Sequence, residues 1–232
     1  VCDVGTDHAH LCVYLVQSGK CSKVIASDII DGPLNSAEQT VSRYQLEDSI
    51  SIVKSDGLKN IDLNGVSDVI IAGMGGENIL SIIKECPTLK EGNISLTLQP
   101  MTKAPLLRKE LYLLGFEIVK EVAVQVGSTF YTIMKVRYTG FSMQLNEVSA
   151  KVGKVNFFDE TSKAYGLHKV QSLRKLVDNL QFSGSDASKL IEVANITELY
   201  ATDKMFTTIQ DVYNAIDTVA KFSTQEKWDN SG

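Results

Sequence analysis

Short apolar runs alternate with helical stretches through the first 140 residues, and this alternation constrains the fold more than any other feature of the sequence. The predicted strands cover residues 1–4, 24–28, 50–54, 67–72 and 94–98, and the predicted helices cover residues 9–17, 33–46, 76–85 and 104–114. Strands that alternate with helices are typical of a parallel sheet covered on both faces. The sequence therefore predicts an α/β domain over residues 1–140. Because Val1 already lies in the first predicted strand, we expect further sequence before it.

Two more strands, residues 117–124 and 130–137, follow without a helix between them, so we expect an antiparallel hairpin. A parallel sheet that ends in such a hairpin is typical of the class I methyltransferase version of the Rossmann-like fold. A dehydrogenase more often ends with another strand–helix step. We therefore predict a mixed Rossmann-like sheet with a C-terminal antiparallel hairpin.

Residues 141–204 have a different character, and we expect a helical, coiled-coil domain there. Apolar residues at a spacing of three and four predict a helix–helix seam, formed by Val170, Leu173, Val177 and Leu180. Residues 141–180 carry six basic and four acidic side chains, although the whole chain has a net charge of −5. Lys169, Arg174 and Lys175 are candidate contacts for RNA phosphates. A solvated helix face explains the same charges, and both interpretations stay open.

Composition is that of a soluble globular protein, with 44% hydrophobic and 22% charged residues. No apolar run approaches the roughly 20 residues that span a bilayer. The four cysteines show no C-x-x-C spacing, which argues against a zinc site. We expect a cytoplasmic, monomeric protein without a metal or a membrane partner.

Small and polar residues gather after the predicted strands, where open α/β sheets bind ligands. The candidate cofactor residues are Asp3, Gly5, Asp7, His8, Asp28, Ile29, Asp56, Gly57, Leu58, Ala72, Gly73, Met74 and Gly75, and Gln99 follows the fifth strand. Asp28 ends the second strand, where a carboxylate can accept both ribose hydroxyls. Asp56 can accept from an adenine amino group with Leu58 against the ring. Gly5 lets a ligand approach the backbone.

The loop after the first predicted strand indicates which kind of cofactor the site would bind. The dinucleotide fingerprint G-x-G-x-x-G is absent, and a diphosphate needs several close backbone contacts. Asp7 would repel a diphosphate but tolerates the cationic sulfonium and ammonium groups of S-adenosylmethionine. We therefore expect S-adenosylmethionine as the cofactor. A purely structural role is open for Asp3 as a strand-end carboxylate, for Asp7 as a helix N-cap, and for His8 and His10 in the first helical turn.

Five segments together resemble a known family. They read DVGTDHAHL, ASDI, SDGL, DVIIAGMGG and LTLQP. They resemble the bacterial tRNA (adenine-N1)-methyltransferases of the TrmK family over roughly residues 1–200. The resemblance implies a class I methyltransferase domain joined to a C-terminal coiled-coil domain, and methylation of adenine 22 in the tRNA D-arm. His10 stands where the family usually has tyrosine, and the family's first helix would precede Val1.

The chemistry of that reaction suggests roles for particular residues. The fourth strand end reads Ala72-Gly73-Met74-Gly75 and lacks the Asn/Asp-Pro-Pro-aromatic motif of exocyclic-amine methyltransferases. Adenine N1 has a free lone pair, so it needs positioning more than a base. The product base is cationic, and Asp7 is the candidate that stabilises its charge. Gln99 could bond a base edge, and Lys103 and Arg108 could reach RNA phosphates.

Three alternatives remain open at this point. One is a methyltransferase that acts on another RNA or DNA base. The others are a nucleoside- or RNA-binding module without catalysis and a nicotinamide oxidoreductase, which the missing glycine fingerprint disfavours. Residues 205–232 resemble the start of the NIF3 family of dinuclear-metal proteins but stop before that family's metal ligands. An ordinary closing helix is the other interpretation of this tail.

Overall fold

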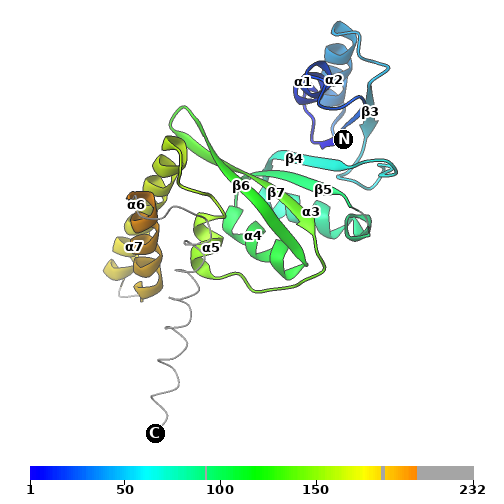
Figure 1. The fold of residues 1–232 in the computed structure, drawn as a ribbon. Coiled ribbons are helices and arrows are strands. Elements are labelled where there is room, and N and C mark those ends of the chain that lie inside the picture. The colour runs from blue at the N-terminus through cyan, green and yellow to red at the C-terminus, as the bar shows by residue number, and fades with distance from the viewer. Residues whose placement is uncertain (92, 184–185, 203–232) are drawn as a thin grey trace. The chain divides into compact units, whose positions relative to one another are not determined.

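The structure is a computed structural model that describes residues 1–91, 93–183 and 186–202 (Figure 1). The chain forms two compact units, Val1–Val155 and a second that begins at Asn156. Within the described residues, no helix is both long and apolar enough to cross a membrane. The NIF3-like segment, residues 205–232, lies outside the described residues.

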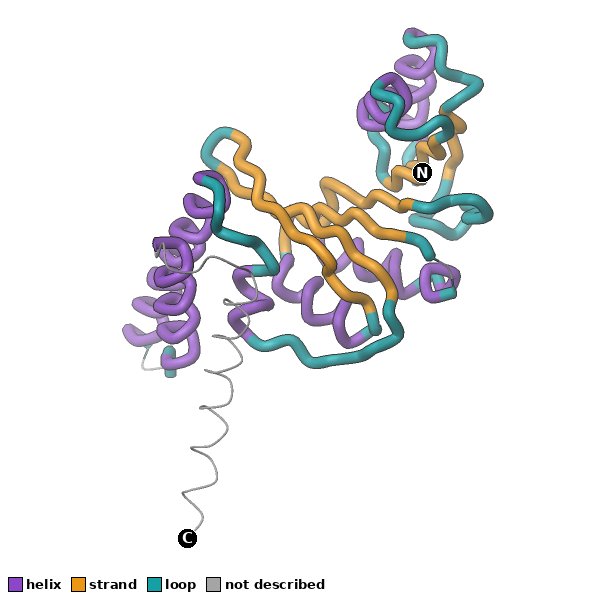
Figure 2. Tube along the Cα trace, viewed as in Figure 1, coloured by secondary structure: helices purple, strands orange, loops and turns teal. Residues whose placement is uncertain are grey.

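The first unit is built on one mixed sheet, which Figure 2 shows as orange strands with purple helices packed against them. In the described residues its strands are β1 (Cys2–Val4), β2 (Val24–Asp28), β3 (Ile50–Lys54), β4 (Asp68–Gly75), β5 (Ser95–Thr102), β6 (Phe116–Val126) and β7 (Thr129–Tyr138). The helices are α1 (His10–Gln17), α2 (Asp31–Arg43), α3 (Gly76–Lys84), α4 (Ala104–Leu113) and α5 (Glu147–Val152), with a short 3-10 helix, η1 (Pro87–Lys90).

The strand order is β3-β2-β1-β4-β5-β7-β6. The first five strands run parallel, and β7 pairs antiparallel with both β5 and β6. This confirms the predicted mixed sheet with a C-terminal hairpin. The chain moves outward in one direction from β1 to β3 and in the other direction from β4, so the topological switch point lies between β1 and β4.

Helices cover the two faces in pairs. α1 and α2 pack together near β2 and β3, and α3 and α4 pack together near β4, β5 and β6. Successive residues of a strand point to opposite faces. Val24 and Ala26 of β2 accordingly lie in the core cluster beneath α1 and α2, whereas Ile25 between them packs against the larger cluster beneath α3 and α4. Both faces are thus buried, as in other parallel sheets.

The boundary of the first unit falls after Val155, later than the predicted end at residue 140. The segment after β7 is tied back to α4 and β6. Met143 N–H donates to the Tyr112 carbonyl at 3.1 Å, and Lys154 N–H donates to the Glu121 carboxylate at 2.8 Å. Lys109 of α4 also pairs with Glu147 of α5. These contacts make α5 part of the sheet domain, so the predicted boundary is wrong.

The second unit contains α6 (Glu160–Phe182) and α7 (Ser188–Thr202), packed against each other. Asp159 caps α6 by accepting from Ser162 N–H at 2.8 Å, which satisfies a free donor of the first turn. Val170, Leu173 and Val177 are buried and Leu180 is half-buried, which confirms the predicted seam. A β-carbon on Gly166 would lie 2.9 Å from the Ala201 side chain, so this glycine lets the helices approach closely. Coiled-coil geometry stays a prediction.

Candidate active site

The turn after β1 folds back toward β2. Gly5 N–H and Thr6 N–H both donate to the Ser27 carbonyl, at 2.8 and 2.9 Å. Gly5 has a φ of +76°, which favours glycine, and a β-carbon there would lie only 2.2 Å from Cε of Met74. Glycine is therefore needed for both backbone conformation and space. The Met74 side chain, near the end of β4, therefore lies close to the turn after β1.

Asp3, in β1, stabilises this turn through hydrogen bonds. Its buried carboxylate accepts from the Thr6 hydroxyl at 2.8 Å and from the Cys12 thiol at 3.3 Å. Burial raises the pKa of the Asp3 carboxyl, and burial likewise raises the pKa of the Cys12 thiol, which keeps its proton as a donor. Asp3 thus joins β1, the turn and α1. These contacts give Asp3 a structural role, and a contact between Asp3 and the cofactor stays a prediction.

The ends of β2 and β3 bring two more carboxylates to the same edge. Asp28 accepts from Ile30 N–H at 2.9 Å through one oxygen, which leaves its second oxygen available to a ligand. After β3, Ser55 N–H donates to the Asp28 carbonyl at 3.0 Å. Asp56 follows, and the buried Leu58 anchors the loop in the core. Gly57 has a φ of +58°, and a β-carbon there would lie 2.9 Å from Ile82 of α3.

The glycine-rich segment lies within β4 rather than after it, which differs from the predicted strand end at residue 72. β4 continues to Gly75 because it stays paired with β5, but the register shifts around Met74. Gly73 has a φ of +77°, and its N–H donates to Oε1 of Gln99 at 2.8 Å. A β-carbon on Gly76 would lie 2.9 Å from the carbonyl oxygens of Thr102 and Lys103. The irregular strand end is therefore held by Gln99 and by close packing against β5.

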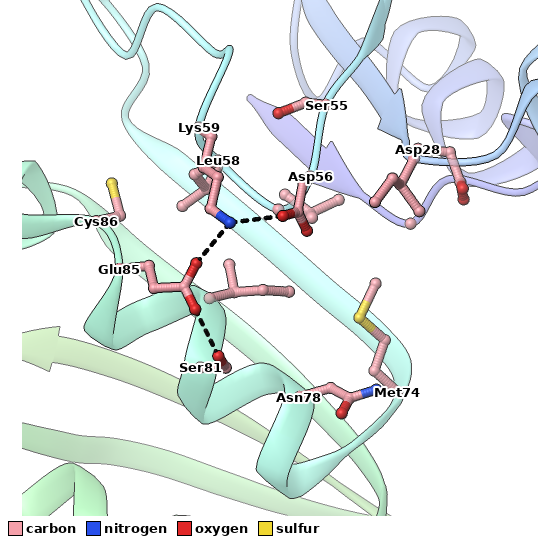
Figure 3. A pocket seen from close by; sticks show the side chains of 15 residues that line it. Asp28, Ser55, Asp56, Leu58, Lys59, Met74, Asn78, Ser81, Glu85 and Cys86 are labelled. Carbon is pink, nitrogen blue, oxygen red and sulfur yellow. Dashed lines mark hydrogen bonds and ion pairs between the residues drawn. The ribbon is translucent and has the colours of Figure 1, made fainter.

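A cavity of about 320 Å³ opens where these strand ends meet (Figure 3). Its walls come from the ends of β1 to β4 and from one face of α3, beside the topological switch point. The volume is at the lower end of the range for small-molecule sites. The predicted cofactor residues that line it are Gly5, Asp28, Ile29, Asp56, Gly57, Leu58 and Met74. Of the described residues, the lining set does not include Asp3, Asp7, His8, Ala72, Gly73 or Gly75.

Sequence reasoning missed the α3 side of this cavity. Asn78, Ser81, Ile82 and Glu85 line it, together with Ser55, Lys59 and Cys86. The first four of these residues lie on α3 or directly after it. They are separated by three, one and three positions, which places them on one face of a helix. That spacing, directly after the glycine-rich segment, was the available signal. Lys59 carried no motif that marked it.

The polar residues at the start of α1 lie at the surface. The Asp7 side chain is 70% exposed, and its Oδ1 lies 3.6 Å from Nε2 of His8. The rings of His8 and His10 stack with their centroids 5.6 Å apart. Asp7 has a φ of 51°, and the N-cap of α1 is Ala9, so Asp7 is not the N-cap. The Asp7 charge is therefore available to a ligand at this edge.

Arg108 does not lie where the sequence placed it. We expected it to contact RNA, but its side chain is 1% exposed, and its guanidinium donates to Glu121 at 2.6 Å. It also donates to the Ala150 carbonyl at 2.7 Å and to the Thr132 hydroxyl at 3.2 Å. Because its donors are committed inside the protein, the RNA-contact prediction for Arg108 is wrong. Lys103, at the start of α4, is exposed.

The basic residues of α6 differ in their surroundings. Arg174 pairs with Glu198 of α7, and Lys169 lies over the Tyr165 ring at 5.2 Å from its centroid. Lys175 is exposed. Among the described residues, no group of three or more His, Cys, Asp or Glu side chains is arranged to hold a metal ion.

The sheet order, the antiparallel β7 and the cavity at the switch point define a class I methyltransferase domain. A family model described as a methyltransferase domain matches residues 1–134. The tRNA (adenine(22)-N(1))-methyltransferase of Bacillus subtilis (strain 168) is 30% identical over 85% of this chain and 87% of its own length. The chain belongs to this family, the TrmK tRNA (adenine-N1)-methyltransferases.

Solved structures agree with this assignment. The crystal structure of the B. subtilis m1A22 tRNA methyltransferase TrmK has a TM-score of 0.69 and 26% identity, and the match covers 91% of this chain and 90% of that one. A candidate tRNA (m1A22) methyltransferase of Streptococcus pneumoniae, in complex with S-adenosyl-L-methionine, has a TM-score of 0.72 and 28% identity. That match covers 85% of this chain and 91% of the other.

Proposed function

We propose that this protein transfers a methyl group from S-adenosylmethionine to N1 of adenine 22 in the D-arm of tRNA. The observation that carries the proposal is the cavity at the ends of β1 to β4, lined by Gly5, Asp28 and Asp56, in a chain of this family. The partner is accordingly tRNA. The monomeric state and the cytoplasmic location remain predictions from the sequence.

The lining residues fit S-adenosylmethionine. Asp28 has one oxygen left to accept from the ribose hydroxyls. Asp56 offers an acceptor to the adenine amino group, with Leu58 beside the ring. Gly5 would hold the part of the cofactor nearest the backbone, where a side chain larger than hydrogen would meet Met74. When bound, the cofactor supplies a methyl group activated by a sulfonium centre.

The chain's own residues position the target base and balance its charge. Adenine N1 attacks with a lone pair and loses no proton, so a general base is unnecessary. The base becomes cationic as the methyl group arrives, and the Asp7 carboxylate stabilises that charge. Gln99 accepts from Gly73 N–H through Oε1, and its Nε2 makes long contacts of 3.4 Å to the Pro100 carbonyl and 3.6 Å to Met101 Sδ. An acceptor on the base would replace these long contacts.

Phosphate contacts would come from residues outside the cavity. Lys103 lies at the surface just after β5, and Lys175 lies exposed on α6. Lys169 and Arg174 carry the same charge on α6 but already contact Tyr165 and Glu198. Such contacts add affinity without reading sequence. We propose that the helical unit supplies this part of tRNA binding.

The test is methyl transfer from labelled S-adenosylmethionine to an unmodified tRNA transcript, followed by nucleoside analysis. Label in 1-methyladenosine, and its loss from a transcript with guanine at position 22, is the expected result. Label in another nucleoside would contradict the assigned base. Retained binding of S-adenosylhomocysteine without transfer to any tRNA would indicate a binding module without catalysis.

A further inference from the structure

Lys59 joins two elements of the cavity wall. Its Nζ lies 2.5 Å from Oδ2 of Asp56 and 2.9 Å from Oε2 of Glu85. Asp56 belongs to the loop after β3, and Glu85 follows the last residue of α3. Figure 3 shows the ammonium group between the two carboxylates, with both ion pairs drawn. One cation therefore links the loop after β3 to the end of α3.

Glu85 is also held from its own helix. The Ser81 hydroxyl donates to Oε1 of Glu85 at 2.8 Å. Glu85 is thus engaged at both oxygens, whereas Lys59 engages only Oδ2 of Asp56. The remaining oxygen of Asp56, in a residue that lines the cavity, is an acceptor for a ligand.

Electrostatics favours a fixed geometry for this group. Hydrogen bonds to Asp56 and Glu85 raise the pKa of Lys59, and the hydrogen bond from Lys59 lowers the pKa of Glu85. Both shifts favour the charged forms of Lys59 and Glu85. Without the cation, the two carboxylates would repel each other across the cavity wall. Lys59 is 49% exposed, and exposed ion pairs contribute little to folding, so the effect of this group should appear in ligand binding.

We propose that Lys59 is a positioning residue for the nucleoside base of the cofactor. It holds Asp56 through Oδ2 so that the other oxygen accepts from an exocyclic amino group, which selects adenine over a base with an oxygen at that position. This inference rests on the proposed function, because it takes the cavity as the adenosyl site. A carbonyl oxygen facing the same carboxylate would leave two acceptors without a proton between them.

The test is calorimetric binding of S-adenosylhomocysteine and of S-inosylhomocysteine, which replaces the amino group with oxygen. The wild-type protein should prefer the adenosyl ligand. Lys59→Met should weaken adenosyl binding about five- to tenfold and leave inosyl binding nearly unchanged, so the preference collapses. Lys59→Arg, which keeps a donor fork between the carboxylates, should retain most of the preference.

Lys54→Met is the matched control. Lys54 pairs with Asp31 at 2.5 Å with similar exposure, and of the described residues the cavity lining includes neither of them. This variant should bind both ligands as the wild type does. Equal weakening of both ligands by Lys59→Met, or an unchanged preference, would overturn the inference while leaving the cofactor assignment intact. If the wild-type protein binds neither ligand, the proposed function itself fails, and the inference with it.

Discussion

Two clusters of charged side chains in the sheet domain have similar residue types but differ in their exposure to solvent. Lys59 lies between Asp56 and Glu85 at the cavity, and all three side chains are about half exposed. Arg108 and Glu121 form the other cluster, where the two side chains are 1% and 0% exposed. The first cluster is open to solvent, and the second is enclosed by protein. The two clusters therefore differ in burial rather than in residue type, and only the exposed one can reach a ligand in the cavity.

The buried cluster is stable because the charged groups of Arg108 and Glu121 have hydrogen-bond partners inside the protein. Arg108 donates to Glu121, Thr132 and Ala150, and Glu121 also accepts from Lys154 N–H. A buried ion pair is tolerated when the remaining donors and acceptors are satisfied in this way. This ion pair connects α4, β6, β7 and the segment around α5, so it stabilises the C-terminal part of the sheet domain. The cavity cluster makes no comparable set of internal bonds.

Breaking the buried pair should give the largest effect. Arg108→Met should lower the free energy of unfolding by about 3–5 kcal/mol, because it leaves the Glu121 charge buried without its partner. Urea unfolding followed by circular dichroism measures this. The double variant Arg108→Met with Glu121→Leu should recover most of the loss. Lys135→Met, which breaks the part-exposed pair with Asp68, should cost less than about 1 kcal/mol. Similar losses for Arg108→Met and Lys135→Met would contradict the distinction between the clusters.

At the cavity, Asp28→Asn should weaken binding of S-adenosylhomocysteine by about 10- to 100-fold, because a charged acceptor for the ribose hydroxyls is lost. The fold should be preserved, since asparagine still accepts from Ile30 N–H. Titration calorimetry and thermal unfolding give the two readouts. Asp31→Asn is the control, because Asp31 is exposed and pairs with Lys54. Wild-type affinity in Asp28→Asn would remove Asp28 from the site.

Asp7→Asn should lower kcat about five- to tenfold while changing the affinity for S-adenosylhomocysteine little. Asparagine adopts the positive φ of this position readily, so the change removes the charge without adding backbone strain. Single-turnover methyl transfer to tRNA measures the effect. Asp62→Asn removes an equal charge from another loop and should leave the rate unchanged. An unaltered rate in Asp7→Asn would exclude stabilisation of the cationic base by this carboxylate.

The smallest effect is expected on α6. Lys175→Gln should raise KM for tRNA about two- to fivefold at moderate salt and leave kcat unchanged, because one phosphate contact is lost. The slope of log KM against log salt should fall by about 1. Lys189→Gln, at an exposed position of α7, is the comparison. If neither variant changes the salt dependence, the charge of α6 belongs to a solvated surface.

The sequence predicted the strand-end part of the site because topology alone determines it. The carboxyl ends of parallel strands meet at one edge, so Gly5, Asp28 and Asp56 could be brought together without knowledge of side-chain packing. The bulged end of β4 could not be predicted, because it involves a register shift against β5 and a side-chain contact between Gln99 and Gly73.

The errors have a common physical cause. Arg108 lies beside the buried Leu107 and Leu111 in α4, and its partner Glu121 is on a different element. Helical periodicity shows which positions are apolar but does not show that a distant carboxylate will bury an arginine. For the same reason the sequence did not predict the ion pairs of Lys59, which depend on how α3 packs against the loop after β3. The boundary at residue 140 was wrong because α5 is held to the domain by such contacts.

The most direct measurement is a crystal structure of the chain with S-adenosylhomocysteine. We expect the ribose hydroxyls within about 3 Å of the Asp28 carboxylate and the adenine amino group at the free oxygen of Asp56, with Lys59 still on its other oxygen. A nucleoside bound away from the ends of β1 to β4, or a ribose without contact to Asp28, would contradict the assignment of this cavity as the cofactor site.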